Sequence, residues 1–338
     1  MKSAVRDALA SLLHLTGLTP PKDPRRLAIV TFHRVLARHE LAEYPLPRIA
    51  VTPEELHWFL AVFSRHYECG PLQTIHQRWS DGSGSSRPLL AITFDDAQRD
   101  NFRHAKPVLD RMGMKATFFV PTQAAETGKL LWHDRAAYAT RAWMIHDQMQ
   151  ASMSVTSLGV PRQTPPWLFP AAAVERLKLR PAAAREHWID TAEKALGRSA
   201  IPAWDGMMSF DEIAVLAREG HEIGSHSHTH ALMTGSDDES LRNELDASAR
   251  ILEDRLGMTP TSFCYPNGDA DDRVVEATRK GRYLRAVTTA WGNNTPGTDP
   301  FRLSRFDIQS ATARSRRGDL SEARIALRMS GFQRQVRS

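Results

Sequence analysis

The sequence predicts an α/β fold built on a parallel sheet, either open or closed into a barrel. Strand-like and helix-like runs alternate along the chain. Glycines at 113, 220, 257 and 281 each end a helix-like run shortly before the next strand, a position that favours a left-handed residue. With 338 residues, the chain is long enough for one large barrel or two ordinary domains.

The expected elements follow in order. Seven strands are predicted at residues 27–33, 89–94, 115–121, 222–226, 262–266, 284–289 and 301–308. Five helices are predicted at residues 53–67, 99–112, 210–219, 238–256 and 271–281. The first helix starts at Thr52-Pro53, since proline is favoured in the first helical turn, and Asp271 and Asp272 are expected to cap the last. In such a fold the chemistry belongs at the C-terminal ends of the strands.

Two short polar motifs follow strands in this pattern. Thr93-Phe94-Asp95-Asp96 ends one strand, and Gly224-Ser225-His226-Ser227-His228-Thr229-His230 ends another. One carboxylate and two imidazoles are ligands that zinc and other divalent transition metals accept. A second carboxylate beside the ligand could act as a general base on metal-activated water. The two motifs together predict a metallohydrolase site.

The alternation breaks between about residues 129 and 206. This stretch holds five of the eight tryptophans and the proline-rich run 161–170, and it is expected to be a partly helical insertion. Its aromatic residues would either form a small satellite core or line a lid that stacks on sugar rings or an acyl chain.

Composition narrows the function classes. Two cysteines exclude both a disulfide framework and a thiolate zinc site. The net charge of +5 arises in the C-terminal segment, where nine arginines and three acidic residues follow residue 301. Such a segment is either solvated or in contact with anionic lipid or polysaccharide. Without an aromatic-rich basic stripe or a nucleic-acid motif, nucleic-acid binding is not expected.

The N-terminus shows no convincing signal peptide. Val5, Leu9, Leu12 and Leu13 fall on one helical face, which indicates a short packed helix or an interfacial anchor. No run approaches the length of a transmembrane helix. A cytoplasmic location is therefore expected, with peripheral membrane contact through the N-terminal helix or the basic tail as the alternative.

Three motifs, in this order, resemble the polysaccharide deacetylases with the NodB homology fold: residues 93–96, residues 224–230 and Phe263-Cys264-Tyr265-Pro266-Asn267-Gly268. Residues 31–35 and 288–292 are similar to one branch of that family. The resemblance implies a distorted (β/α) barrel of about seven parallel strands. The expected domain spans residues 25–310 with the insertion inside it, between an N-terminal amphipathic segment (1–24) and a basic C-terminal tail (311–338).

The resemblance also implies an activity, the metal-dependent removal of acetyl groups from a sugar in envelope or surface polysaccharide metabolism, from nitrogen rather than oxygen. Position by position, Asp96, His226 and His230 match the metal ligands and Asp95 matches the catalytic base. The metal is expected to be zinc, with cobalt, manganese and iron as alternatives. The backbone N–H of Asn267 would help to hold the oxyanion, with Tyr265 beside it among the substrate contacts.

The sequence departs from the family in three places. Asn267 replaces a tyrosine that often follows the motif proline, which matters less if only the backbone contributes. Cys264 occupies the position of an arginine that orients the base in many members, and Arg305 is expected to replace that arginine. No histidine follows His230, so the usual general acid is missing. His33, at the end of the first strand, is the first candidate for the acid. The cluster Trp132-His133-Asp134 at the mouth of the insertion is the second, with Trp132 and Asp134 as substrate contacts.

Two other functions stay open from the sequence. The missing acid and arginine also fit a non-catalytic carbohydrate-binding protein on a degenerate barrel. Two histidines and a carboxylate also suit non-haem iron, so that an oxygen-dependent reaction is the third hypothesis.

Overall fold

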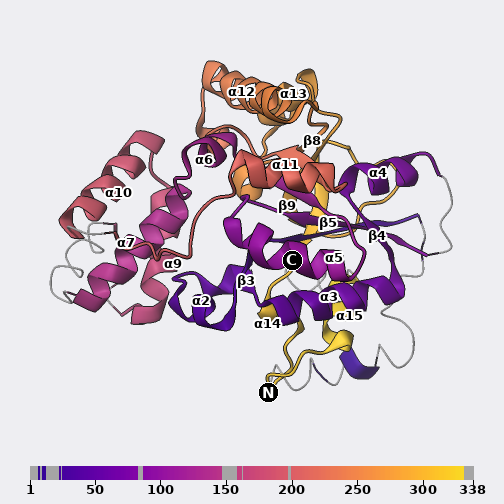
Figure 1. The fold of residues 1–338 in the computed structure, drawn as a ribbon, viewed down its shortest axis with the longest axis horizontal. Helices are drawn as coiled ribbons and strands as arrows, with labels where there is room; N and C mark the ends of the chain where they lie inside the picture. Colours follow the sequence, from indigo (N-terminus) through magenta and orange to yellow (C-terminus); the bar gives the residue numbers. More distant parts are fainter. Residues whose placement is uncertain are drawn as a thin grey trace.

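Seven parallel strands close into a barrel (Figure 1) in a computed structural model that describes residues 7, 10–12, 23, 25–82, 87–146, 158–161, 163–196 and 199–330. Around the barrel the strands run in the order β1, β10, β9, β8, β7, β6, β5, and β5 pairs back with β1. Their bounds are β1 Leu27–Phe32, β5 Leu89–Phe94, β6 Thr117–Val120, β7 Glu222–Ser225, β8 Ser262–Cys264, β9 Arg285–Trp291 and β10 Leu303–Asp307. The barrel and all seven expected strands are thereby confirmed.

Three short strands were not expected. The strand β4 (Glu68–Gly70) pairs with the first half of β5, and β2 (Arg34–Val35) pairs with β3 (Ala50–Val51) in a separate two-stranded sheet. Two- and three-residue strands are too short to show alternation, so the sequence carries no periodic signal for them.

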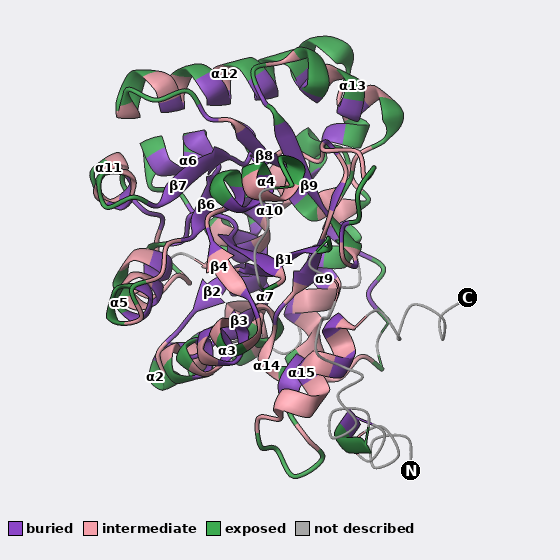
Figure 2. Cartoon of the chain, turned by 90° about the vertical axis from the view of Figure 1, so that its right-hand side faces the viewer, coloured by how far each residue is buried: buried purple, intermediate pink, exposed green. Residues whose placement is uncertain are grey.

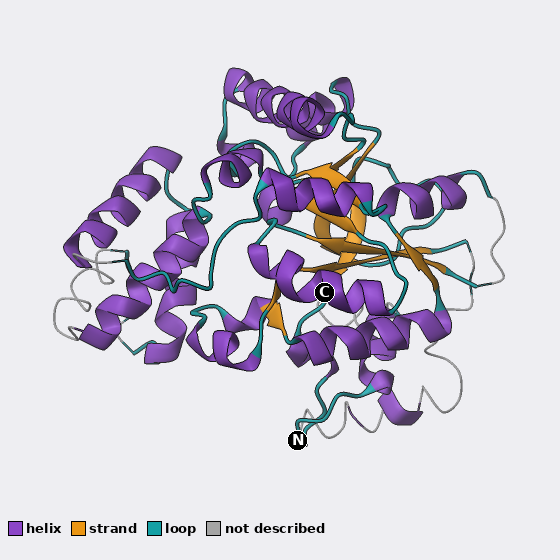
Figure 3. Cartoon of the chain, in the orientation of Figure 1, coloured by secondary structure: helices purple, strands orange, loops and turns teal. Residues whose placement is uncertain are grey.

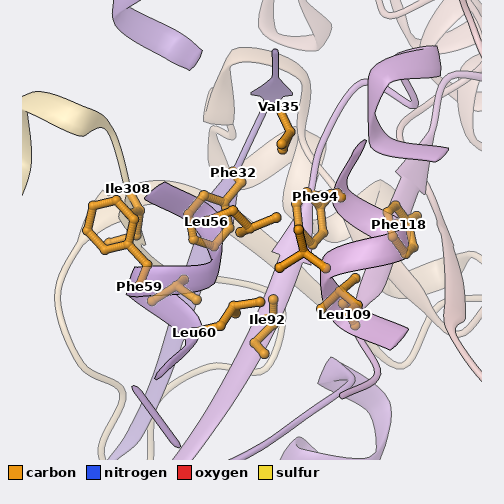
Figure 4. Packing of buried hydrophobic residues seen from close by; sticks show 14 of the residues in the cluster. Phe32, Val35, Leu56, Phe59, Leu60, Ile92, Phe94, Leu109, Phe118 and Ile308 are labelled. Carbon is orange, nitrogen blue, oxygen red and sulfur yellow. The ribbon is translucent and has the colours of Figure 1, made fainter. Parts of the chain in front are cut away.

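Alternate residues of the strands fill two different cores, as a barrel requires. Leu27 and Ile29 of β1 belong to a cluster with Leu89 and Ala91 of β5, inside the barrel. The alternate residues Ala28 and Val30 belong to the larger cluster under the surrounding helices. Figure 4 shows this outer layer, where Phe32, Ile92 and Phe94 from the strands meet Leu56, Phe59 and Leu60 from a helix. Because both faces are buried, β1 and β5 are apolar except for one threonine each, Thr31 and Thr93.

The five expected helices surround the barrel (Figure 3). They are α3 Pro53–His66, α5 Lys106–Arg111, α11 Phe210–Arg218, α12 Asp238–Leu256 and α13 Asp272–Lys280, with a π-helical turn, η2 Asn101–Ala105, before α5. The side chains of Thr52 and Asp271 cap α3 and α13. Gly257 ends α12 in the left-handed conformation with φ 67°, as expected. At Gly281 that expectation is wrong: φ is −77°, because the chain leaves α13 in an extended conformation.

Shorter helices complete the layer, namely α2 Arg38–Glu43, α4 Leu72–Ser80, α6 Thr122–Thr127, α14 Ser310–Ala313 and α15 Glu322–Met329. The helix α15 packs Ile325 and Met329 into the large cluster, so part of the expected basic tail belongs to the folded domain. Most of the expected N-terminal segment lies outside the described residues. In the part of the chain that the structure describes, no helix is long and apolar enough to cross a membrane.

The insertion between β6 and β7 forms a helical lobe beside the barrel, at the left of Figure 1. It contains α7 Trp132–His146, α9 Phe169–Lys178 and α10 Ala182–Leu196. Each of these helices has both buried and exposed positions, as does α12, where Figure 2 shows the two kinds of residue side by side. Trp132 and Trp188 contribute to a core of its own, whereas Trp167 is 76% exposed.

Candidate active site

The candidate site lies at the C-terminal mouth of the barrel, in the loops that follow β5, β7 and β8. Among the described residues, all five non-glycine residues with positive φ lie in these loops: Asp96, Ala97, Ser227, His230 and Asn267. A left-handed conformation costs such residues about 1 kcal/mol or more each, and residues held in this way cluster at functional sites. The unfavourable backbone conformations of this chain are thus concentrated in the loops that carry the candidate site.

Asp96, His226 and His230 converge on one point. The Oδ1 atom of Asp96 lies 3.3 Å from Nε2 of His226 and 3.3 Å from Nε2 of His230. All three side chains are buried, and their donor atoms lie within 4.8 Å of one another. Burial lowers the pKa of His230 to about 4, which keeps this imidazole neutral, the form that ligates a metal. The residue types and their spacing suit a divalent transition metal.

Backbone contacts orient this cluster. Nδ1 of His226 lies 2.7 Å from the carbonyl oxygen of Cys264, and this hydrogen bond leaves Nε2 facing Asp96. His228, between the two candidate ligands, turns away, with Nδ1 2.9 Å from the hydroxyl of Thr122.

Glu244 of α12 supports the histidine loop from behind. Its carboxylate accepts hydrogen bonds from the backbone N–H groups of His228 and Thr229, at 2.9 and 2.8 Å, and from the Thr229 hydroxyl at 2.6 Å. This role could not be predicted from the sequence, because Glu244 lies in a long helix rich in charged residues, most of which face solvent.

Asp95 forms a bidentate ion pair with Arg305 of β10. Nη1 and Nη2 of Arg305 donate to the two carboxylate oxygens at 2.8 Å each, and both side chains are buried. Burial alone would raise the pKa of Asp95, but the guanidinium outweighs it and holds the pKa at about 2. Nη2 also lies 3.2 Å from Sγ of Cys264. Arg305 therefore contacts the Asp95 carboxylate next to Cys264, the residue at the position where an orienting arginine was expected.

His33 lies on the other side of Asp95. Its Nε2 is 3.9 Å from Oδ2 of Asp95, and its Nδ1 is 3.9 Å from Oδ1 of Asp307. Nδ1 of His33 and Oδ1 of Asp307 are both buried without a hydrogen-bond partner among the described residues. Asn101 holds the backbone here by donating to the His33 carbonyl at 2.8 Å. His33 thus stands between two carboxylates at the edge of the site.

His133 of α7 approaches the cluster from the insertion. Its Nε2 lies 3.8 Å from Oδ2 of Asp96 and 3.7 Å from Oδ2 of Asp134. Asp134 itself is fully buried and accepts hydrogen bonds from Tyr44 and Gln98, both 2.6 Å long. It therefore lies behind His133 and does not line the cavity in front of it.

Behind His133, three buried carboxylates surround one arginine. Arg34 donates to Asp100 and to Asp205 at 2.6 Å each and lies 3.5 Å from Asp134. Asp100 also accepts from the backbone of Val35 at 2.7 Å. This network, which the sequence did not indicate, ties the insertion to β2.

A cavity of about 630 Å³ opens in front of the cluster and is lined by the candidate metal ligands, Asp95, His33, His133, Trp132, Asn267 and Arg305. Asn267 has φ 59° and ψ 0°. The ring of Tyr265 is buried, and its hydroxyl donates to the carbonyl of Phe301 at 3.1 Å. The ring of Trp132 is stacked with the Arg185 guanidinium, 4.3 Å from its centroid. Of the expected substrate contacts, only Asp134 is absent from this lining.

Sequence comparison identifies the family. The family of polysaccharide deacetylases matches residues 82–156 and 186–284, slightly more than half of the chain. Chitin deacetylase 1 of Cryptococcus neoformans is 40% identical over 96 residues, which are 28% of this chain and 20% of that protein. The chain therefore aligns with only about a fifth of this curated relative.

Solved structures have the same fold. The Streptococcus pyogenes deacetylase PplD, solved with acetate, superposes with a TM-score of 0.59 at 14% identity, covering 91% of this chain and 99% of that one. IcaB of Ammonifex degensii superposes with a TM-score of 0.55 at 16% identity, covering 89% and 95%.

Proposed function

The chain belongs to the polysaccharide deacetylase family, and from that premise we propose that it is a metal-dependent hydrolase acting on an acetylated carbohydrate of the cell envelope or surface. The observation that carries the proposal is the cluster of Asp96, His226 and His230 beside the buried Asp95–Arg305 pair. It combines a divalent-metal donor set with a second, oriented carboxylate in one cavity.

Asp96, His226 and His230 would hold the metal. Zinc suits one carboxylate and two imidazoles, and cobalt, manganese and iron are alternatives for the same donors. When bound, such a metal acts as a Lewis acid that polarises the acetyl carbonyl and lowers the pKa of water.

Asp95 is the proposed general base. Its two hydrogen bonds from Arg305 fix the direction of the carboxylate, and its low pKa keeps it ionised over the whole working pH range. A base with so low a pKa holds a proton only briefly, so the proton must pass to a neighbouring group. His33, 3.9 Å away, is the nearest imidazole to Asp95.

His33 is accordingly the proposed general acid, with His133 as the second candidate. An amine is a poor leaving group unless it is protonated, so cleavage of an N-acetyl group requires such a donor. His33 lines the cavity and lies between Asp95 and Asp307. His133 lies between Asp96 and Asp134 instead, nearer to the proposed metal. The two imidazoles outside the ligand set support an N-acetyl rather than an O-acetyl substrate.

The backbone N–H of Asn267 is proposed to help hold the oxyanion, and Trp132 to contact the sugar. Asp134 and Tyr265, whose polar atoms are engaged within the protein, would act by positioning their neighbours. A cytoplasmic location, with peripheral membrane contact through the N-terminal helix or the basic segment, also stays a proposal. Fractionation of cells that express the full chain tests it.

The decisive experiment measures metal content and acetate release on the same samples. Wild type is compared with Asp96→Ala and His226→Ala, using N-acetylated and O-acetylated sugars as substrates. We expect one metal per chain and acetate release in wild type, and loss of both in the variants. Metal binding without acetate release from any sugar would contradict a hydrolase and favour the non-catalytic carbohydrate-binding alternative.

A further inference from the structure

The cavity continues beyond the metal cluster into a region of different chemistry. Its outer part is lined by six apolar residues from two segments, which we name the apolar wall: Leu46, Pro47, Ile49, Trp167, Leu168 and Ala171. The first three lie between α2 and β3, and the others come from the insertion, around the start of α9. The insertion therefore builds one side of the cavity as well as its own core.

The apolar wall lines the cavity, and part of it also backs onto the protein interior, because Leu46 and Ile49 pack against the neighbouring hydrophobic clusters. Trp167 is 76% exposed, Pro47 is exposed, and the other four are only partly buried. Apolar side chains that line the same cavity as a polar cluster are typical of a ligand-binding surface. Three charged residues line the cavity beside the wall: Lys178 pairs with Glu175 at 2.9 Å, and Arg48 lies between Pro47 and Ile49 with its side chain exposed.

The side chains of the wall offer contacts of one kind. Leucine, isoleucine, proline and alanine side chains can neither donate nor accept a hydrogen bond, so five of the six give sugar hydroxyls no partner. They gain free energy by removing methylene groups of a ligand from water. A groove for several sugar units would instead need amides and carboxylates along its length.

We propose that the substrate is an amphiphile, an acetylated amino sugar joined to an apolar chain that lies on the apolar wall while the acetyl group reaches the metal cluster. This inference rests on the proposed function and adds the class of the aglycone. Both parts of the ligand occupy one continuous cavity of about 630 Å³.

The test measures acetate release from methyl, butyl and octyl glycosides of N-acetylglucosamine, below the concentration at which the octyl compound forms micelles. We expect kcat/KM to rise at least tenfold from methyl to octyl. Full burial of each methylene would give about a fourfold rise, which corresponds to about 0.8 kcal/mol. In Trp167→Ala and Leu168→Asn the ratio of octyl to methyl rates should fall towards one.

Leu179→Asn is the matched control, because Leu179 follows the same helix, is 77% exposed and lies outside the cavity lining. It should keep the wild-type ratio. Acetate release with equal rates for methyl and octyl glycosides would overturn the inference and leave the proposed function intact. Rates of acetate release that rise with the number of sugar units, and not with the number of methylene groups, would also overturn the inference.

Calorimetric binding of the same glycosides separates the two proposals. Tighter binding of the octyl compound without acetate release from any glycoside would support the apolar site and contradict the deacetylase. Equal affinities for the methyl and octyl compounds would overturn the apolar site whether or not acetate is released.

Discussion

Arg305 and Asp95 form two parallel hydrogen bonds of 2.8 Å although 210 residues separate them in the chain. Arg305 enters from β10, whereas Cys264, at the end of β8, occupies the position at which the resemblance to the family implied an orienting arginine. Because Nη2 of Arg305 is 3.2 Å from Sγ of Cys264, the guanidinium occupies the space beside the smaller residue. The positive charge thus reaches the carboxylate from a different strand.

Replacing Asp95 by asparagine should abolish most turnover and spare the metal. Loss of a positioned general base costs about 10²–10⁴ in kcat. Asp95 is not one of the three proposed ligands, so elemental analysis of Asp95→Asn should give the wild-type metal content. Asp96→Asn, the neighbouring control, should lose both. Full activity in Asp95→Asn would remove Asp95 from the mechanism.

His33→Gln should affect substrates according to their leaving group. An activated aryl acetate needs no protonation of its leaving group, whereas an N-acetyl sugar does. We therefore expect a loss of about 10²–10⁴ in kcat on the sugar and a much smaller loss on p-nitrophenyl acetate. His133→Gln is the paired variant. If it alone shows this selective loss, His133 is the acid; equal losses on both substrates in both variants exclude either histidine from that role.

Glu244→Gln should weaken metal binding from a distance. The substitution removes the charge that accepts three hydrogen bonds from residues 228 and 229, between the two candidate histidine ligands. Residues that orient ligands in this way typically contribute 10- to 100-fold in affinity, so competition with a chelator should give a dissociation constant higher by that factor. Asp246→Asn, an exposed position on the same helix, should bind the metal as wild type does. An unchanged metal affinity in Glu244→Gln would show that the histidine loop keeps its conformation without the Glu244 carboxylate.

His221 should make the protein less stable in acid. Burial lowers its pKa to about 4, and its Nδ1 accepts a hydrogen bond from the N–H of Ala116, which protonation would abolish. In the unfolded chain the pKa is about 6.5, so the contribution is complete above pH 6.5 and is lost as the pH falls towards 4. The loss is on the order of 3 kcal/mol, at about 1.4 kcal/mol per pKa unit.

Asparagine at position 221 keeps an acceptor and does not titrate. The free energy of unfolding of His221→Asn, from denaturant titrations at pH 4.5 and 7, should therefore change less with pH than that of wild type. His187→Asn, at an exposed position, should keep the wild-type dependence. An identical pH dependence in all three proteins would contradict the assignment to His221.

The sequence predicted the parts of this fold that carry a local signal. The strands β1 and β5 are nearly continuous apolar runs because both of their faces are buried. Asp96 follows β5, and His226 and His230 follow β7. Parallel strands bring such residues to one mouth, so the metal cluster could be inferred from order alone. The helix caps Thr52 and Asp271 could also be predicted, because a cap depends only on residues close to it in the sequence.

What the sequence did not predict depends on long-range packing. Glu244 and Asp100 act through partners on other elements, and nothing near them in the chain marks them. Asp134 was expected to contact the substrate, but its partners Tyr44 and Gln98, distant in the chain, hold it behind His133. The left-handed conformations of Asp96 and His230 are also imposed by the surrounding loops, since aspartate and histidine adopt them only infrequently. At Gly281 the local signal was present, and the direction of the following chain overrode it.

The closure of the barrel has a consequence for biosynthesis. Val30 of β1 pairs with Phe306 of β10, so strands from opposite ends of the domain complete the cylinder. A nascent chain can begin to assemble the middle strands, but it cannot seal the barrel before β10 has left the ribosome. Because β10 also brings Arg305, Asp95 gains its counter-ion only in this last step. Completion of the proposed catalytic centre is thereby coupled to synthesis of β10, and a product terminated before β10 would lack the ion pair that orients Asp95.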